Sequence, residues 1–133
     1  MAQTLPANLA LNDTIDEPWV DAVRACLAEL QPTAWVLPTF ANGWSNFGGI
    51  YQVARYRKVG DVVQVEGLVK GGTFNVAMFT LPVGFRPPLT VQFAQISNGA
   101  AAAGISVQAD GGFVCFLGNA ANVQINVQFS VTP

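Results

Sequence analysis

The side chains best suited to recognising a ligand crowd into one short run of the sequence. This run, FANGWSNFGG at residues 40–49, mixes aromatic rings and asparagine amides with three glycines. Rings can stack on the flat face of a ligand, and amides can both donate and accept hydrogen bonds. The same composition suits a packed corner, because Asn42 and Gly43 form a turn signal, and Trp44 and Phe47 can plug the end of a β-domain. The run is therefore either a ligand-binding loop or the corner that starts a β-domain.

Catalytic and metal chemistry is poorly represented in the chain. There is no histidine, the commonest general base and metal ligand. No cysteine or aspartate cluster has the spacing of a zinc or calcium site, and no nucleophile elbow or phosphate-binding loop is present. Residues 33–133 contain only Asp61, Glu66 and Asp110 as acids, so a carboxylate pair for glycoside hydrolysis could form only across chains or by a fold-back. We expect no enzymatic activity, no cofactor and no metal.

The composition favours a surface that is partly covered by other protein chains. Of the 133 residues, 51% are hydrophobic and 11% are charged, whereas an average globular domain has roughly 25% charged residues. So little charge predicts burial against copies of the chain or a partner. No run reaches the roughly 18 uncharged apolar residues of a membrane span, so we expect no membrane insertion. The net charge of +2 over residues 33–133 is too weak for a nucleic-acid surface.

The N-terminal part differs from the rest in charge and in periodicity. Residues 1–32 carry a net charge of −4 and are expected to form an extended arm at 1–14 followed by a helix at 16–30. Asp16 suits the N-cap of this helix, and Pro32 stops it. Its apolar positions follow the a/d spacing of a coiled coil and are Val20, Val23, Leu27 and Leu30. The helix either lies on the β-domain or forms a short parallel coiled coil that joins copies of the chain.

From residue 33 the pattern alternates as in β-strands, and turn signals recur every 8 to 12 residues. Hairpin turns are expected at residues 60–61 and 110–112, and Val91, Phe93 and Ile96 are core candidates. About eight strands are predicted, at 33–40, 51–59, 62–70, 74–81, 90–97, 103–109, 113–118 and 123–131. The last strand points alternate apolar residues inward and presents a polar but uncharged opposite face. This predicts an all-β domain at 33–133, an antiparallel sandwich or barrel, preceded by one short helix.

The remaining local signals concern the cysteines and the N-terminus. The two cysteines, Cys26 and Cys115, fall in different expected elements and do not form a disulfide framework. We expect both to be buried, reduced thiols. The first residues lack the basic and apolar regions of a signal peptide, which predicts synthesis in a cytoplasm.

One extended pattern resembles a known family. The matching stretches are NGWSNFGG, YRKVGDVVQVEGLVKGGT and MFTLPVGFRPP. The chain here resembles the C-terminal β-domains of tail-fibre, minor-tail and receptor-binding proteins of tailed bacteriophages. The likeness covers residues 35–90 well and residues 91–133 only in strand pattern, and Phe85 stands where tyrosine is usual. The matched positions are Asn42, Gly43, Trp44, Asn46, Tyr56, Arg57, Lys58, Gly60, Asp61, Gly67, Gly71, Gly72, Thr73, Leu81, Pro82, Gly84, Arg86 and Pro87.

The resemblance implies a jelly-roll-like antiparallel β-sandwich assembled as a homotrimer. It implies a virion-surface protein, on tail or capsid, made in the cytoplasm of the host bacterium. Residues 1–32 would bind other virion proteins and help form the trimer, while residues 33–133 would project outward.

Three functions stay open on these observations. The first is a trimeric tail fibre or spike whose tip contacts host surface polysaccharide. Aromatic and amide side chains would then stack on sugars and bond their hydroxyls. The candidates are Trp44, Asn46, Tyr51 and Tyr56, although a tryptophan between glycines also suits a corner plug. The second is a capsid decoration or head-fibre protein with no required sugar site. The third is a non-viral secreted lectin-like module, which the missing signal peptide disfavours.

Overall fold

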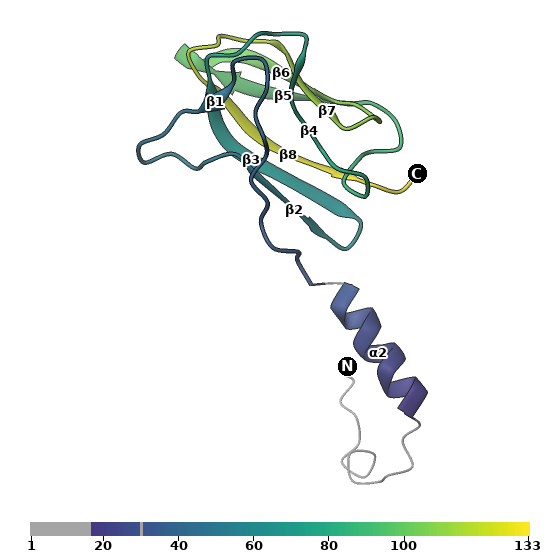
Figure 1. Cartoon of the computed structure of the whole chain (residues 1–133). Coiled ribbons are helices and arrows are strands. Elements are labelled where there is room, and N and C mark those ends of the chain that lie inside the picture. Colours follow the sequence, from purple (N-terminus) through teal and green to yellow (C-terminus); the bar gives the residue numbers. More distant parts are fainter. Residues whose placement is uncertain (1–16, 30) are drawn as a thin grey trace. The chain divides into compact units, whose positions relative to one another are not determined.

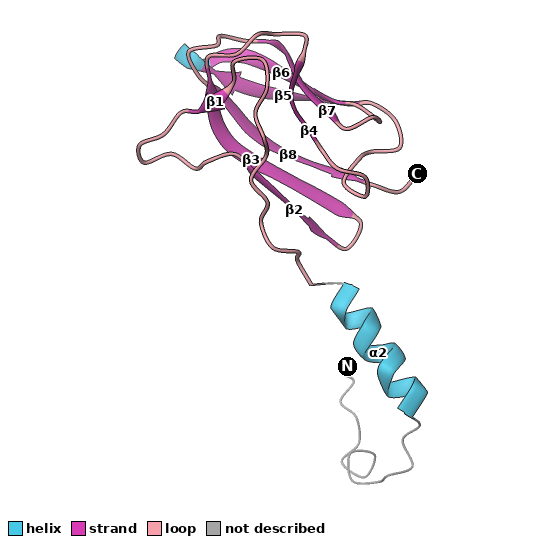
Figure 2. Cartoon of the chain, in the orientation of Figure 1, coloured by secondary structure: helices cyan, strands magenta, loops and turns pink. Residues whose placement is uncertain are grey.

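The computed structural model describes residues 17–29 and 31–133 (Figure 1). The chain divides into two units between Gln31 and Pro32. Within the described residues, the N-terminal unit contains a helix and the C-terminal unit contains the strands (Figure 2).

Helix α2 spans Glu17–Glu29. Glu17 and Pro18 occupy its first turn, where an acidic residue and a proline are both favourable. Two side chains of the expected apolar stripe are well exposed, Val23 at 39% and Leu27 at 55%, and Val20 is partly exposed. Leu30, together with the expected arm at 1–14 and the N-cap Asp16, lies outside the described residues. Within the described part of the chain, no helix is long and apolar enough to cross a membrane.

The C-terminal unit is one antiparallel sheet of eight strands. Its strands are β1 (Ser45–Asn46), β2 (Arg55–Val59), β3 (Val62–Lys70), β4 (Ala77–Thr80), β5 (Val91–Ser97), β6 (Ala101–Val107), β7 (Gly112–Leu117) and β8 (Val123–Ser130). The order is β1-β3-β8-β5-β6-β7-β4, and β2 pairs with β3 on the same edge as β1, at the other end of the strand. The prediction of an all-β, eight-stranded antiparallel domain is confirmed, and in the described residues a helix precedes it. Both predicted hairpin turns are also observed, between β2 and β3 and between β6 and β7.

The predicted strand at 33–40 was wrong. That segment forms no ladder with β2; it makes one isolated bridge, Val36 with Tyr56, and Pro32 just before it makes another with Val59. Pro38 has no amide hydrogen to continue a ladder. The chain then leaves β2 and reaches β4 at the opposite edge of the sheet, where Ala41 N donates to Met78 O at 2.8 Å. The eighth strand is instead the short β1, inside the aromatic run.

The predicted two-sheet sandwich is a single sheet that curls on itself. Strands β3 and β8 pair along eight residues, from Val62–Ser130 to Val69–Val123. Strands β8 and β5 pair only through Ser97 and Val123, so the sheet folds sharply there yet stays hydrogen-bonded. One half holds β1, β2, β3 and β8, and the other holds β4 to β7 (Figure 1). The core fills the space inside the curl and includes Val63, Val65, Val69, Met78, Phe79, Ile105, Val107, Phe113, Ile125 and Val127.

Strand parity explains one error in the predicted core. Ile96 is 55% exposed, although it was expected inside. On β5 the residues that share a face are two apart, so Val91 and Phe93 face the core with Ser97, and Ile96 faces outward. Ser97 is 2% exposed, and its Oγ accepts a hydrogen bond from Asn119 N at 3.0 Å. The buried side chain of Ser97 therefore points inward at the place where the sheet bends between β5 and β8.

Gln95 bridges the two halves where backbone pairing stops. Its Oε1 accepts from Asn126 N at 2.9 Å, and its Nε2 donates to Asn126 O at 3.4 Å. The side-chain amide thus replaces a backbone pair across the opening between β5 and β8. We expect Gln95→Ala to lower the free energy of unfolding by about 1 kcal/mol and to speed hydrogen exchange at the Asn126 amide. Gln92→Ala, an exposed site on the same strand, is the control, and equal exchange in both variants would contradict the bridge.

The two cysteines have different environments. Cys115 is buried, as predicted. Burial raises the pKa of its thiol, and a backbone hydrogen bond at Leu117 acts in the opposite direction. The Sγ–H also donates to Leu117 O at 3.3 Å. The prediction was wrong for Cys26, which is exposed on α2.

Candidate functional site

Trp44 is part of a packed corner in this chain. Its side chain is 4% exposed, its Nε1 donates to Thr73 O at 3.0 Å, and its ring stacks on Phe74 with centroids 5.9 Å apart. The ring lies directly against Gly72, where any Cβ would collide with it. The indole N–H and the ring surface of Trp44 thus already have partners within the chain.

Asn46 and Tyr56 are likewise committed to the fold. Asn46 Oδ1 accepts from Ala54 N at 2.8 Å, which anchors the residues that lead into β2. Tyr56 is 6% exposed, and its ring packs on Phe79 and Phe85 with centroids 6.4 Å and 5.4 Å away. Burial also raises the pKa of the Tyr56 hydroxyl. Of the four sequence candidates, Tyr51 is the well exposed one, at 51%, and Asn46 is partly exposed.

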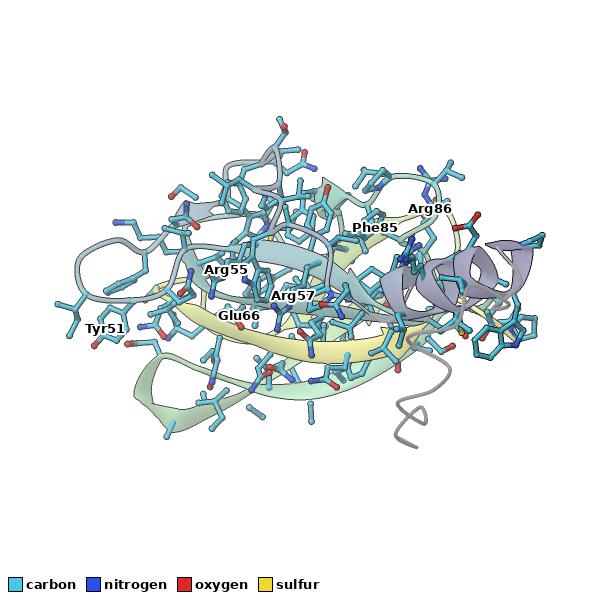
Figure 3. The ribbon with its side chains drawn as sticks, turned by 90° about the horizontal axis from the view of Figure 1, so that it is seen from below. Tyr51, Arg55, Arg57, Glu66, Phe85 and Arg86 are labelled. Atoms are coloured by element: carbon cyan, nitrogen blue, oxygen red, sulfur yellow. The ribbon has the colours of Figure 1, made fainter. Side chains whose placement is uncertain are left out.

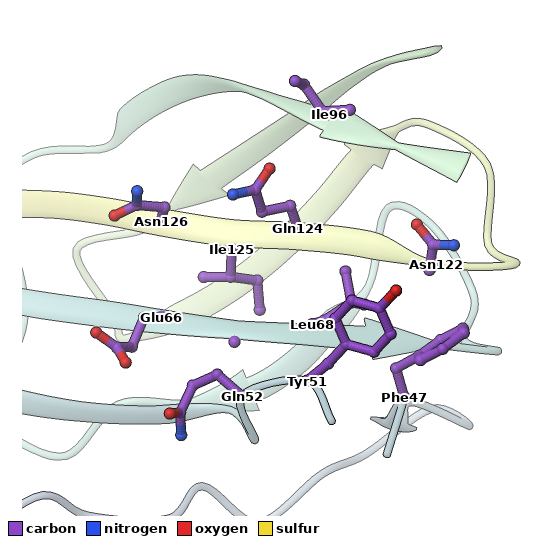
Figure 4. Close-up of a pocket in the computed structure, with 11 residues that line it drawn as sticks. Phe47, Tyr51, Gln52, Glu66, Leu68, Ile96, Asn122, Gln124, Ile125 and Asn126 are labelled. Carbon is purple, nitrogen blue, oxygen red and sulfur yellow. The ribbon is translucent and has the colours of Figure 1, made fainter. Parts of the chain in front are cut away.

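Tyr51 stands over a hollow of about 530 Å³ on the outer side of the sheet (Figure 4). The walls come from the loop before β2, from the outward residues of β3 and β8, and from the end of β5. Its lining residues are Phe47, Tyr51, Gln52, Glu66, Gly67, Leu68, Ile96, Asn122, Gln124, Ile125 and Asn126. We call this feature the Tyr51 hollow. Its volume lies within the roughly 300–1,000 Å³ typical of small-molecule sites.

The loop that carries Tyr51 is tied to β3 at both ends. Phe47 N donates to Leu68 O at 2.9 Å, and Leu68 N donates to Gln52 O at 3.0 Å. Gly67 allows this close approach, because a Cβ there would lie 2.5 Å from the Ala54 Cα, and its φ of 147° also favours glycine. The loop is therefore held against the sheet, and Tyr51 projects from a defined position.

The lining combines an apolar part with several polar groups. Phe47 and Tyr51 meet edge to face with ring centroids 5.3 Å apart, and Leu68 and Ile96 extend the apolar surface. Figure 4 shows the two rings together at one end and Glu66 with Gln52 towards the other. The remaining polar side chains are Asn122, Gln124 and Asn126. Rings beside amides that donate and accept hydrogen bonds can bind a molecule with both apolar faces and hydroxyls.

Glu66 links the hollow to a row of cationic side chains on β2. Arg55 Nη2 lies 3.0 Å from Glu66 Oε2, and Arg57 Nε donates to Gln64 Oε1 at 2.8 Å. Both guanidinium groups also contact the Trp35 ring, with centroid distances of 4.0 Å and 4.3 Å. Figure 3 shows these arginines and Glu66 near one another, with Tyr51 further out on its loop. Among residues 17–29 and 31–133, no group of three or more His, Cys, Asp or Glu could hold a metal ion.

Most lining residues of the hollow were missed by the sequence reasoning. Ile96 was assigned to the core, Phe47 to a corner plug, and Glu66 was noted only as an isolated acid on a strand. One usable signal was present, since β8 showed a polar, uncharged face that includes Gln124 and Asn126. Such a face on a chain with few charges marks a surface able to form hydrogen bonds.

Comparisons with known proteins support the resemblance at the level of the fold. No family model matches the chain, and no curated protein matches it. Among solved structures, the chain is similar to the receptor binding protein (gp15) of Listeria phage PSA, with 19% identity and a TM-score of 0.56. The match covers 97% of this chain and 90% of that chain. The two proteins therefore share a fold over nearly their whole lengths.

Proposed function

We propose that this chain is a virion protein of a tailed bacteriophage, of the tail-fibre or receptor-binding kind, that contacts the surface of the host cell. The observation that carries the proposal is the fold shared with a phage receptor binding protein over 97% of the chain. The phage-like motifs in residues 35–90 support it independently.

The Tyr51 hollow is the proposed contact with the host. Tyr51, one of the candidate ligand-binding residues, is exposed there. The loop that carries it is held by two backbone hydrogen bonds to Leu68. The hollow's mixture of rings and amides suits a surface polysaccharide. Trp44, Asn46 and Tyr56 are left out of the proposed contact, because their polar or ring contacts are already made within the chain.

The proposal includes a homotrimer and an attachment role for residues 1–32. Val23 and Leu27 are apolar side chains left well exposed on α2, which supports helix pairing between copies. With Val20 and Leu30 they would form the seam, and the acidic segment would bind other virion proteins. Light scattering on the full chain is expected to give three times its 14.1 kDa mass. A monomeric mass would remove the trimer from the proposal.

Particles that carry this chain provide the test of the function. We expect gold-labelled antibody against the chain to mark the tail of intact particles. An excess of the purified full chain should lower the adsorption of those particles to their host, because it occupies the same receptor. Label on the head, together with unchanged adsorption, would favour a capsid decoration or head-fibre protein instead.

A further inference from the structure

The Tyr51 hollow has little positive charge to offer an anion. Among the described residues, Glu66 is the one acid that lines it, and no lysine or arginine does. Lys70 stays near the rim, with Nζ 5.6 Å from the Phe47 ring centroid. The Arg55 guanidinium forms an ion pair with Glu66 and lies over the Trp35 ring. Proteins that recognise phosphate or carboxylate groups normally present arginine or lysine to them. An anionic group in this hollow would meet the Glu66 carboxylate instead.

Carboxamides dominate the polar lining, and two of them are held in place. Asn122 Nδ2 donates to Asn98 Oδ1 at 3.1 Å, and Gln52 Nε2 donates to Val53 O at 3.1 Å. Gln124 and Asn126 complete the set, and Gln95 clamps the Asn126 backbone. An amide donates and accepts within one group, as a sugar hydroxyl does. Holding these amides in advance lowers the entropy cost of binding.

We infer that the Tyr51 hollow selects uncharged saccharides and discriminates against anionic polymers. The inference rests on the proposed host-contact function and adds the class of ligand. The rings of Phe47 and Tyr51 cover an apolar sugar face, the amides bond the hydroxyls, and the ion pair with Glu66 keeps Arg55 from pairing with an anionic ligand. Glu66 therefore acts as a specificity residue, because its carboxylate both occupies Arg55 and repels anions.

A saccharide array that contains uncharged chains (dextran, chitotetraose) and anionic chains (polygalacturonate, polyglycerol phosphate) tests the inference on the full chain. The wild-type protein is expected to bind only uncharged members, and equally at about 0.05 M and about 0.5 M salt, because no ion pair with the ligand is screened. Glu66→Gln removes the repelling charge and leaves Arg55 without its carboxylate. This variant is expected to gain about fivefold or more in binding to the anionic chains, roughly 1 kcal/mol in free energy.

Asp61→Asn is the matched control, since it removes one negative charge at an exposed turn residue outside the hollow. It is expected to bind the array as the wild type does. An equal gain in both variants, a wild-type preference for anionic chains, or no wild-type binding to any chain would overturn the inference. The adsorption assay separates the two claims. If the purified chain lowers particle adsorption but prefers anionic chains on the array, the proposed host-contact function stands and only the uncharged ligand class is rejected.

Discussion

Replacing Trp44 with alanine is expected to lower the free energy of unfolding of the β unit by about 3–5 kcal/mol. The side chain is 4% exposed and fills the space between Gly72 and Phe74. Its removal leaves a cavity and also takes away the donor to Thr73 O. The free energy of unfolding of a whole domain is only about 5–15 kcal/mol, so this one substitution removes a large part of it. Urea unfolding followed by circular dichroism at a fixed protein concentration measures the loss.

Two further variants separate packing from the hydrogen bond. Trp44→Phe keeps a ring against Phe74 but loses the indole N–H, and we expect it to be intermediate between alanine and the wild type. Leu89→Ala changes a side chain that is 76% exposed and should alter stability by less than about 0.5 kcal/mol. If Trp44→Ala unfolds at the wild-type urea concentration, the corner is not packed as described, and Trp44 returns as a candidate for ligand contact.

Tyr51→Ala is expected to have the opposite profile, with weak binding and nearly unchanged stability. The ring is 51% exposed, and its main packing contact is the edge-to-face pair with Phe47. We expect a loss of less than about 1 kcal/mol in unfolding free energy. Under the proposed function, the concentration of purified chain that halves particle adsorption should rise by about tenfold or more. That change corresponds to about 1.4 kcal/mol or more of lost ligand contact.

The adsorption result for Tyr51 can be checked with two companion proteins. Tyr51→Phe retains the ring, so it should compete nearly as well as the wild type if the ring stacks on the ligand. Val83→Ala removes an apolar side chain that is 83% exposed and lies outside the hollow, and it should compete fully. Equal competition by Tyr51→Ala and Val83→Ala would show that Tyr51 does not contact the receptor.

Local patterns in the sequence were enough to predict most of the strands. Alternation along residues 123–131 correctly placed Val123, Ile125, Val127 and Phe129 inside, because successive side chains on a strand face opposite sides. The turns at 60–61 and 110–112 were readable for a similar reason. Each depends on the conformations and side-chain hydrogen bonds of its own few residues, such as Asp110 Oδ1 accepting from Gly112 N at 2.9 Å.

The site could not be read in the same way, because its walls come from segments distant in sequence. Phe47 and Tyr51 precede β2, Glu66 and Leu68 lie on β3, Ile96 lies on β5, and Asn122 to Asn126 lie at and within the start of β8. Composition drew the sequence reasoning to Trp44 and Tyr56, which are matching positions of the phage-like pattern. The structure buries both and exposes Tyr51.

The sequence by itself determined a β-domain with a helix before it, its hairpins and the inward face of its longest strands. These follow from short-range periodicity, turn chemistry and hydrophobic burial. Only the tertiary structure decided that the sheet is continuous and curls at Ser97 and Val123, that the aromatic run 40–49 is a packed corner at Trp44, and that its neighbour Tyr51 overlooks a hollow. These depend on which strands pair and how closely backbones approach, as at Gly67 and Gly72. Such long-range contacts leave no fixed spacing in the chain.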